Sequence, residues 1–94
     1  MAFQMTEAAA REILEAATRS GAEGVALRIA AKTTDGGVAF GMGFDEQAPG
    51  DQVSQFGALT VLIAETSRDL LDAAVLDFGE VEGGGQDFIF SEAP

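Results

Sequence analysis

The sequence predicts a mixed α+β domain with one amphipathic N-terminal helix, about six short strands and a second short helix. Three observations lead to this prediction. Apolar residues follow the 3.6-residue period of a helix over residues 7–20, and the two-residue alternation of strands begins after Gly24. Glycine-rich turns separate the strands. Because 47% of the 94 residues are hydrophobic, the chain can form one modest core, and we expect a single domain over residues 1–94.

The N-terminal helix has signals at both of its ends. Thr6 is a good N-cap, and Glu7 places a carboxylate at the positive end of the helix dipole. Arg19 suits the last turn, and Gly21 supplies the left-handed conformation that ends many helices. The apolar stripe of this helix consists of Ala10, Ile13, Leu14 and Ala17.

Two alternating strands follow the helix and predict a hairpin. Val25, Leu27 and Ile29 alternate with residues 26, 28 and 30, as in a strand with one buried face. The connection at residues 32–37 contains Asp35-Gly36, and Asp-Gly is among the stronger hairpin signals. In the second strand the large residues Val38, Phe40, Met42 and Phe44 alternate with the small residues Ala39, Gly41 and Gly43.

The two faces of this second strand carry different expectations. We expect Phe40, Met42 and Phe44 to belong to the core, because a two-residue period favours a buried strand face over a cofactor pocket. The small residues on the opposite face predict a close approach by another layer or by the helix.

The rest of the chain predicts short elements and exposed loops. We expect an acidic loop at 45–51, strands at 52–56 and 59–64, a short helix at 67–72, and strands at 75–81 and 88–90. Thr66 and Asp69 resemble a capping box for the short helix.

Composition excludes several classes of function. The formal net charge of −11 disfavours nucleic acid and anionic membrane surfaces as partners. The chain has no cysteine and no histidine, which excludes disulfides, thiolate nucleophiles, zinc sites with sulfur or nitrogen ligands and self-supplied iron–sulfur ligation. Without a transmembrane run or a secretion signal, we expect a cytoplasmic protein.

Other candidate motifs have simpler explanations. Gly36-Gly37 and Gly83-Gly84-Gly85 lack the Lys-Ser/Thr of a phosphate loop and are better explained as turns. The many carboxylates form no calcium-loop spacing and are interpreted as a solvated acidic surface. Serine catalysis of the common kind would need a histidine, which this chain lacks. Asp69, Asp72 and Asp77 show no common face for an acid/base pair, so we expect no enzyme.

The order of several segments resembles the A-type iron–sulfur carrier family (HesB/IscA-like) across nearly the whole chain. The resembling segments are Thr6–Ala10, Leu27–Ile29, Gly37–Phe40, Leu59–Ala64, Leu71–Phe78 and Phe88–Ser91. The resemblance implies a β-rich sandwich of antiparallel strands, with the N-terminal helix covering one side and a second short helix.

The residues that bind the cluster in that family are missing here. The family uses one cysteine in the glycine turn and a Cys-x-Cys near the C-terminus. Alignment on Ala39-Phe40 places Asp35 at the first cysteine position, and the sequence given ends at Pro94 before a Cys-x-Cys. Because iron–sulfide clusters require thiolate or occasionally histidine ligands, we expect no cofactor. Asp35, Gly36 and Gly37 become the candidate interaction site instead.

The resemblance implies a non-enzymatic accessory or adaptor protein of iron–sulfur cluster assembly or sulfur metabolism, with a protein partner from one of these pathways. Cysteine-free relatives of this kind resemble the DsrR type found in sulfur-metabolism operons. The alternative is a protein that binds iron or another hard metal through Asp35, because a carboxylate stands at the position of a former thiolate.

Overall fold

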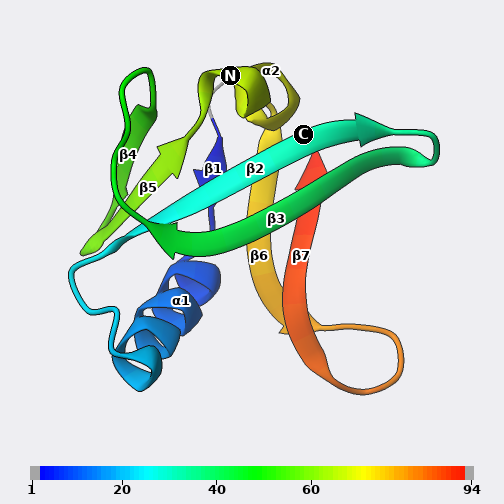
Figure 1. Ribbon diagram of the computed structural model, residues 1–94. Helices are drawn as coiled ribbons and strands as arrows, with labels where there is room; N and C mark the ends of the chain where they lie inside the picture. The colour runs from blue at the N-terminus through cyan, green and yellow to red at the C-terminus, as the bar shows by residue number, and fades with distance from the viewer. Residues whose placement is uncertain (1–2, 93–94) are drawn as a thin grey trace.

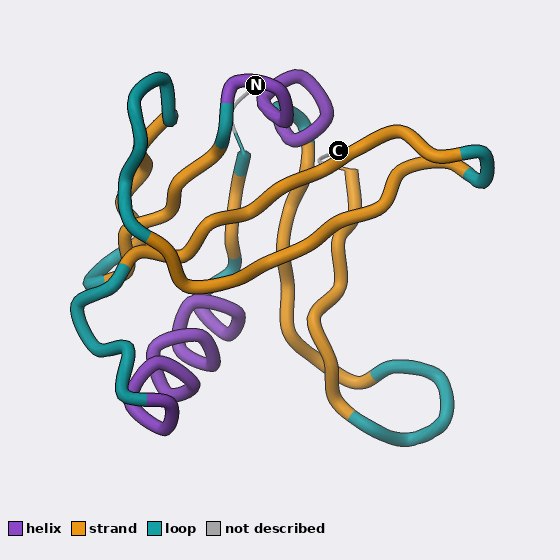
Figure 2. Tube along the Cα trace, viewed as in Figure 1, coloured by secondary structure: helices purple, strands orange, loops and turns teal. Residues whose placement is uncertain are grey.

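The computed structural model describes residues 3–92, which form two β-sheets, one long helix and a short helical segment (Figure 1). In chain order the elements are β1 (Gln4–Met5), α1 (Glu7–Ser20), β2 (Ala26–Thr34), β3 (Gly37–Asp45), β4 (Gln52–Phe56), β5 (Leu59–Ile63), the 3₁₀ turn η1 (Glu65–Ser67), α2 (Arg68–Leu71), β6 (Ala74–Glu80) and β7 (Gln86–Glu92). One sheet has the strand order β3-β2-β5-β4 and the other β1-β6-β7. Figure 2 shows the long β2–β3 ribbon running across strands β6 and β7. The predicted α+β fold class is confirmed.

Helix α1 forms where its end signals predict. The Thr6 hydroxyl oxygen accepts a hydrogen bond from the Ala9 N–H at 3.2 Å, and Gly21 follows the helix with a φ of 73°. Ile13 and Ala17 of the predicted stripe are buried, and α1 packs against β6. The helix is therefore fixed by its caps and by one apolar face.

The pairing of the strands explains how the hairpin is held. Strands β2 and β3 pair antiparallel over nine residues each, from Ala26 opposite Asp45 to Thr34 opposite Gly37. The β4–β5 and β6–β7 pairs are also antiparallel, whereas β2–β5 and β1–β6 are parallel. Both sheets are therefore mixed, whereas the sequence led us to expect antiparallel strands.

The core lies between the two sheets and α1. Leu27, Ile29 and Val61 face inward from the larger sheet, and Leu76 faces inward from the smaller one. These side chains are at most 3% exposed, so the inner faces of β2, β5 and β6 are closely packed and shielded from solvent. This core holds the β2–β3 ribbon against the smaller sheet.

The segment before α2 is organised by a buried serine and not by the predicted capping box. The Ser67 hydroxyl accepts a hydrogen bond from the Ala31 N–H at 3.1 Å and donates one to the Ala31 carbonyl at 3.2 Å. Neither η1 nor α2 has a side-chain cap, so the prediction for Thr66 and Asp69 is wrong. The hydrogen bonds across to β2 replace the local cap.

Among residues 3–92, no helix is both long enough and apolar enough to cross a membrane.

Candidate functional site: the β2–β3 hairpin and its apolar edge

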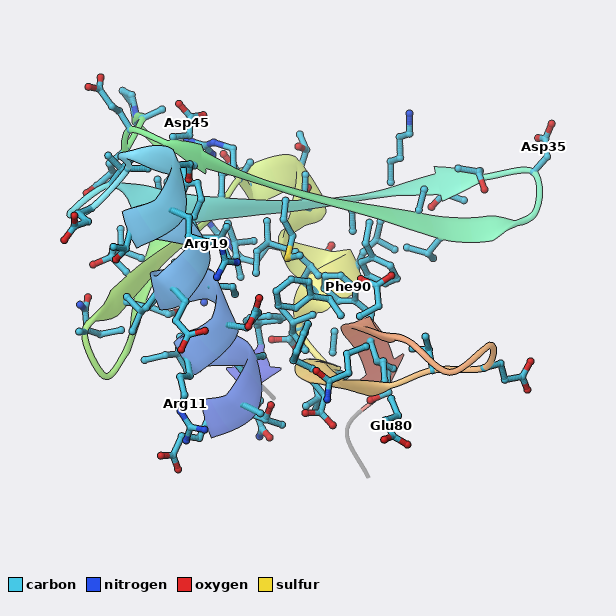
Figure 3. All side chains as sticks on the ribbon, turned by 90° about the horizontal axis from the view of Figure 1, so that it is seen from below. Arg11, Arg19, Asp35, Asp45, Glu80 and Phe90 are labelled. Atoms are coloured by element: carbon cyan, nitrogen blue, oxygen red, sulfur yellow. The ribbon has the colours of Figure 1, made fainter. Side chains whose placement is uncertain are left out.

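The predicted interaction residues form the tip of the β2–β3 hairpin. Asp35, Gly36 and Gly37 are all exposed, and Figure 3 shows the labelled Asp35 pointing into solvent at the far end of the ribbon. Gly37 has a φ of 130°, which side-chain-bearing residues rarely adopt. The Thr34 hydroxyl donates a hydrogen bond to the Gly37 carbonyl at 3.3 Å. The tip is thus a defined turn that projects away from the core.

The hairpin tip does not gather a metal-binding set of side chains. Within residues 3–92, no group of three or more Asp, Glu, His or Cys side chains could hold a metal ion. Hard cations are usually held by several oxygen ligands. The described part of the chain therefore adds no observation in favour of a carboxylate metal site at Asp35.

Strand β3 presents an apolar surface where its two-residue alternation predicts core residues. Val38 is 44% exposed, Phe40 39% and Met42 37%, so the core prediction is wrong for Phe40 and Met42. The prediction is right for Phe44, which packs against the core at the base of the hairpin. The reason is position in the sheet: β3 is an edge strand, and its inner face reaches beyond the core.

A stacked pair of aromatic rings joins the edges of the two sheets. Phe40 of β3 and Phe90 of β7 have ring centroids 4.2 Å apart and an interplanar angle of 6°. Figure 3 shows Phe90 beneath the β2–β3 ribbon. The contact fixes β3 over β7 while leaving part of the Phe40 ring accessible.

A groove of about 450 Å³ lies beside this stacked pair, and we call it the β3–β7 groove. Its lining is mostly apolar and includes one carboxylate side chain. The lining residues are Val38, Phe40, Asp69, Leu70, Ala73, Ala74, Phe90 and Ser91. A groove of this kind suits an apolar side chain better than a polar small molecule.

The outer face of β3 is open. A Cβ atom added at Gly41 or Gly43 would meet nothing within 4 Å, so the predicted close approach of another layer or the helix does not occur within the described chain. The small residues instead leave the backbone of this edge strand uncovered.

An arginine network that no local sequence pattern predicts closes the loop after β3. The Arg28 guanidinium donates two hydrogen bonds to Asp51, at 2.7 and 2.8 Å, and one from Nε to Asp45 at 2.7 Å. It also donates to the Glu46 carbonyl at 3.1 Å. The Asp51 side chain is only 4% exposed, so the loop at 45–51 is not simply a solvated acidic segment.

The network has a clear effect on protonation. The hydrogen bonds from Arg28, followed by one from the Ala48 N–H, lower the pKa of Asp51 to about 2. The Arg28 hydrogen bond and the Glu46 N–H lower the pKa of Asp45. These carboxylates stay ionised at neutral pH and pair with a resident cation, so the network holds the base of β3 in place.

Comparison with solved structures identifies the fold of the chain. The crystal structure of IscA with a 2Fe–2S cluster matches with a TM-score of 0.79 and 27% identity, over 95% of this chain and 83% of that chain. The chain has the IscA-like fold. SufA of Escherichia coli, a protein involved in the biosynthesis of iron–sulfur clusters, shows the same fold, with a TM-score of 0.76 and 22% identity over 97% of this chain and 80% of that chain.

A protein from Aquifex aeolicus, solved by NMR, also shares the IscA-like fold of this chain. Its TM-score is 0.68 and its identity is 30%, over 93% of this chain and 89% of that chain. No protein-family model matches the sequence, and a search of curated proteins finds no match. The chain contains no cysteine, so the cluster ligands that the family resemblance implies are absent from this IscA-like fold.

Proposed function

We propose that this protein is a non-enzymatic accessory or adaptor protein of iron–sulfur cluster assembly or sulfur metabolism that acts through protein contacts and holds no cluster. The observation that carries the proposal is an IscA-like fold in a chain without a single cysteine or histidine. Cluster iron requires thiolate or imidazole ligands, and carboxylates suit hard cations instead.

The exposed apolar edge supports action through protein contacts. Val38, Phe40 and Met42 lie on one strand next to the β3–β7 groove. Contiguous apolar surfaces on soluble domains commonly mark interaction sites. The surface adjoins the hairpin tip at Asp35, which the family resemblance aligns with the first cysteine ligand of the carriers.

The choice of pathway rests on the finer resemblance. The Met42–Asp45 stretch and the Phe88-Ile89-Phe90 ending resemble the DsrR type of sulfur-metabolism operons. The partner comes from sulfur metabolism or from cluster assembly, and the two pathways are alternatives within the same proposal.

Anaerobic reconstitution with iron and sulfide tests the cluster part of the proposal. After desalting, the protein should be colourless, while IscA treated in the same way should show sulfide-to-iron charge-transfer absorbance. Stoichiometric absorbance in the wild-type protein that disappears in Asp35→Ala would show that the fold still holds a cluster and would refute this part.

Capture from the native host tests the adaptor part. The tagged protein should retain a cluster-assembly or sulfur-pathway protein, identified by mass spectrometry. The control is Val38→Lys, which places a charge on the apolar edge. Retention of no protein from either pathway contradicts the adaptor role.

A further inference from the structure

Strand β3 differs from the other edge strands of the described chain in having no protection against pairing. Its residues 37–44 carry no charge and no proline over most of a nine-residue strand. The opposite edge, β4, has five residues and is largely polar, β1 has two residues, and β7 includes Asp87. Natural proteins usually protect long apolar edge strands from pairing with another chain by charged residues, proline, bulges or a covering segment.

The backbone of β3 is available for a further strand. In an antiparallel pair, every second residue directs its N–H and C=O groups away from the neighbouring strand. On β3 these groups point away from β2 toward the open edge. The glycines at positions 41 and 43 leave open space on the outer face, so no side chain there obstructs an approaching backbone.

The inner face next to this edge can receive side chains. An added strand would place alternate side chains on the same face as Phe40 and Met42. At the Phe40 end they would reach the β3–β7 groove, which Leu70 and Phe90 also line. Large apolar side chains at alternate positions fit this surface.

Charge decides between a second copy of this chain and a different partner. An antiparallel pair of β3 strands centred on Gly41 would set Asp45 of one copy opposite Gly37 of the other. Asp35 and Glu46 of both copies would then gather at the two ends, beside the Arg28 network, whose two carboxylates outnumber its one guanidinium. Each chain also carries a net charge of −11. This arrangement is repulsive, whereas a partner with basic residues at both ends of its strand is attracted.

We propose that β3 binds an extended segment of a partner protein as an additional strand of the sheet. The segment has alternating large apolar side chains that contact Phe40 and the β3–β7 groove, and it has Lys or Arg at its ends near Asp35 and Glu46. The inference rests on the proposed function, because it specifies the chemistry of the protein contact through which the adaptor acts. This mode of recognition combines main-chain hydrogen bonds with side-chain specificity.

The test uses a synthetic peptide with two Lys at each end and alternating Val, Thr and Phe in the centre. A peptide with Glu in place of each Lys is its charge control. The structure offers matched variants: Val38→Lys changes a β3 valine that is 44% exposed, and Val53→Lys changes a β4 valine that is 45% exposed. Both variants add the same charge to the same sheet, and their circular dichroism and thermal unfolding establish that each is folded.

Binding is measured by fluorescence anisotropy of the labelled peptide at low and high salt. Val38→Lys should weaken binding at least tenfold, Val53→Lys should change it less than twofold, and the Glu peptide should bind at least tenfold more weakly than the Lys peptide. Equal effects of the two valine variants, or no binding of the Lys peptide to the wild-type protein, overturn the proposal.

Amide hydrogen exchange tests strand addition itself. With the peptide bound, alternate amides of residues 38–44 should gain at least tenfold protection, and those of β4 should be unchanged. Binding without this protection would show that the peptide docks by side chains alone and would overturn the proposal. A dimer of the free protein that Val38→Lys dissociates would assign the edge to a second copy and would also overturn it.

The outcomes separate this inference from the proposed function. A protein that binds the peptide but assembles a cluster defeats the proposed function and leaves the strand-addition site intact. A colourless protein that captures a sulfur-pathway partner but does not bind the peptide defeats only the strand-addition site.

Discussion

Arg28 and its two carboxylates make the stability of the protein depend on pH. The pKa of Asp51 falls from 3.8 in the unfolded chain to about 2 in the folded protein. The contribution of the ionised Asp51 carboxylate to the free energy of unfolding is therefore present above pH 3.8 and is lost as the pH falls toward 2. The loop at 45–51 should loosen in this window.

The variant Asp51→Asn tests this dependence. It should be less stable than the wild-type protein at pH 7. The difference in free energy of unfolding between the two proteins should become smaller as the pH falls from about 4 to about 2. Denaturant unfolding followed by circular dichroism measures the difference. In an Arg28→Met background the narrowing should be smaller, because only the Ala48 N–H then holds the Asp51 carboxylate. A constant difference at all pH values in the wild-type background would contradict the assignment.

Ser67 provides a second prediction at the residue scale. The variant Ser67→Ala leaves the buried Ala31 N–H and carbonyl without their side-chain partner, so the free energy of unfolding should fall by about 2 kcal/mol. The exposed Ser91→Ala is the control and should stay within about 0.5 kcal/mol of the wild-type value. Equal stability of the two variants in denaturant titrations would argue against the bridging role of Ser67.

Single-residue roles were the hardest to predict from the sequence. Arg28 binds partners 17 and 23 positions away, and Ser67 bonds to a strand 36 positions earlier. No local pattern encodes such contacts, because they depend on the sheet topology. Asp35 was placed at a turn correctly, because Asp-Gly acts locally.

Helix α1 depends on its N-terminal cap for stability. Thr6 accepts a hydrogen bond from Ala9 and donates one to Asp77 at 2.7 Å, so it joins α1 to β6. Thr6→Ala should lower the free energy of unfolding by about 1 kcal/mol, measured by denaturant titration. Thr6→Ser keeps the hydroxyl and should retain most of the stability, and an alanine variant as stable as the serine variant would disprove the cap.

Elements with local signals were predicted well. Helix α1, the β2–β3 hairpin and β4 lie within a few residues of their expected positions. Caps, turns and alternation depend on residues that are close together in the sequence. Strand β1 was missed, because two residues carry no period and its pairing with β6 is distant in sequence. The alternation of β3 correctly grouped Phe40 with Met42 on one face, but a period does not show how far the opposing sheet extends.

The net charge of −11 determines how the stability of the protein responds to salt. Self-repulsion disfavours the compact state, and salt screens it over about 8 Å at physiological ionic strength. Raising NaCl from about 20 to 300 mM should therefore raise the melting temperature by a few degrees, measured by differential scanning calorimetry. A fall in melting temperature would mean that the Arg28 network outweighs the general repulsion.

The parallel pairing of β1 with β6 has a consequence for biosynthesis. Gln4 lies beside Val75, so the smaller sheet needs residues from both ends of the sequence. On the ribosome, the β2–β3 hairpin can form as soon as it emerges, but β1 must wait until some seventy further residues have been translated. Until then the apolar face of α1 lacks its packing surface on β6 and stays exposed to water.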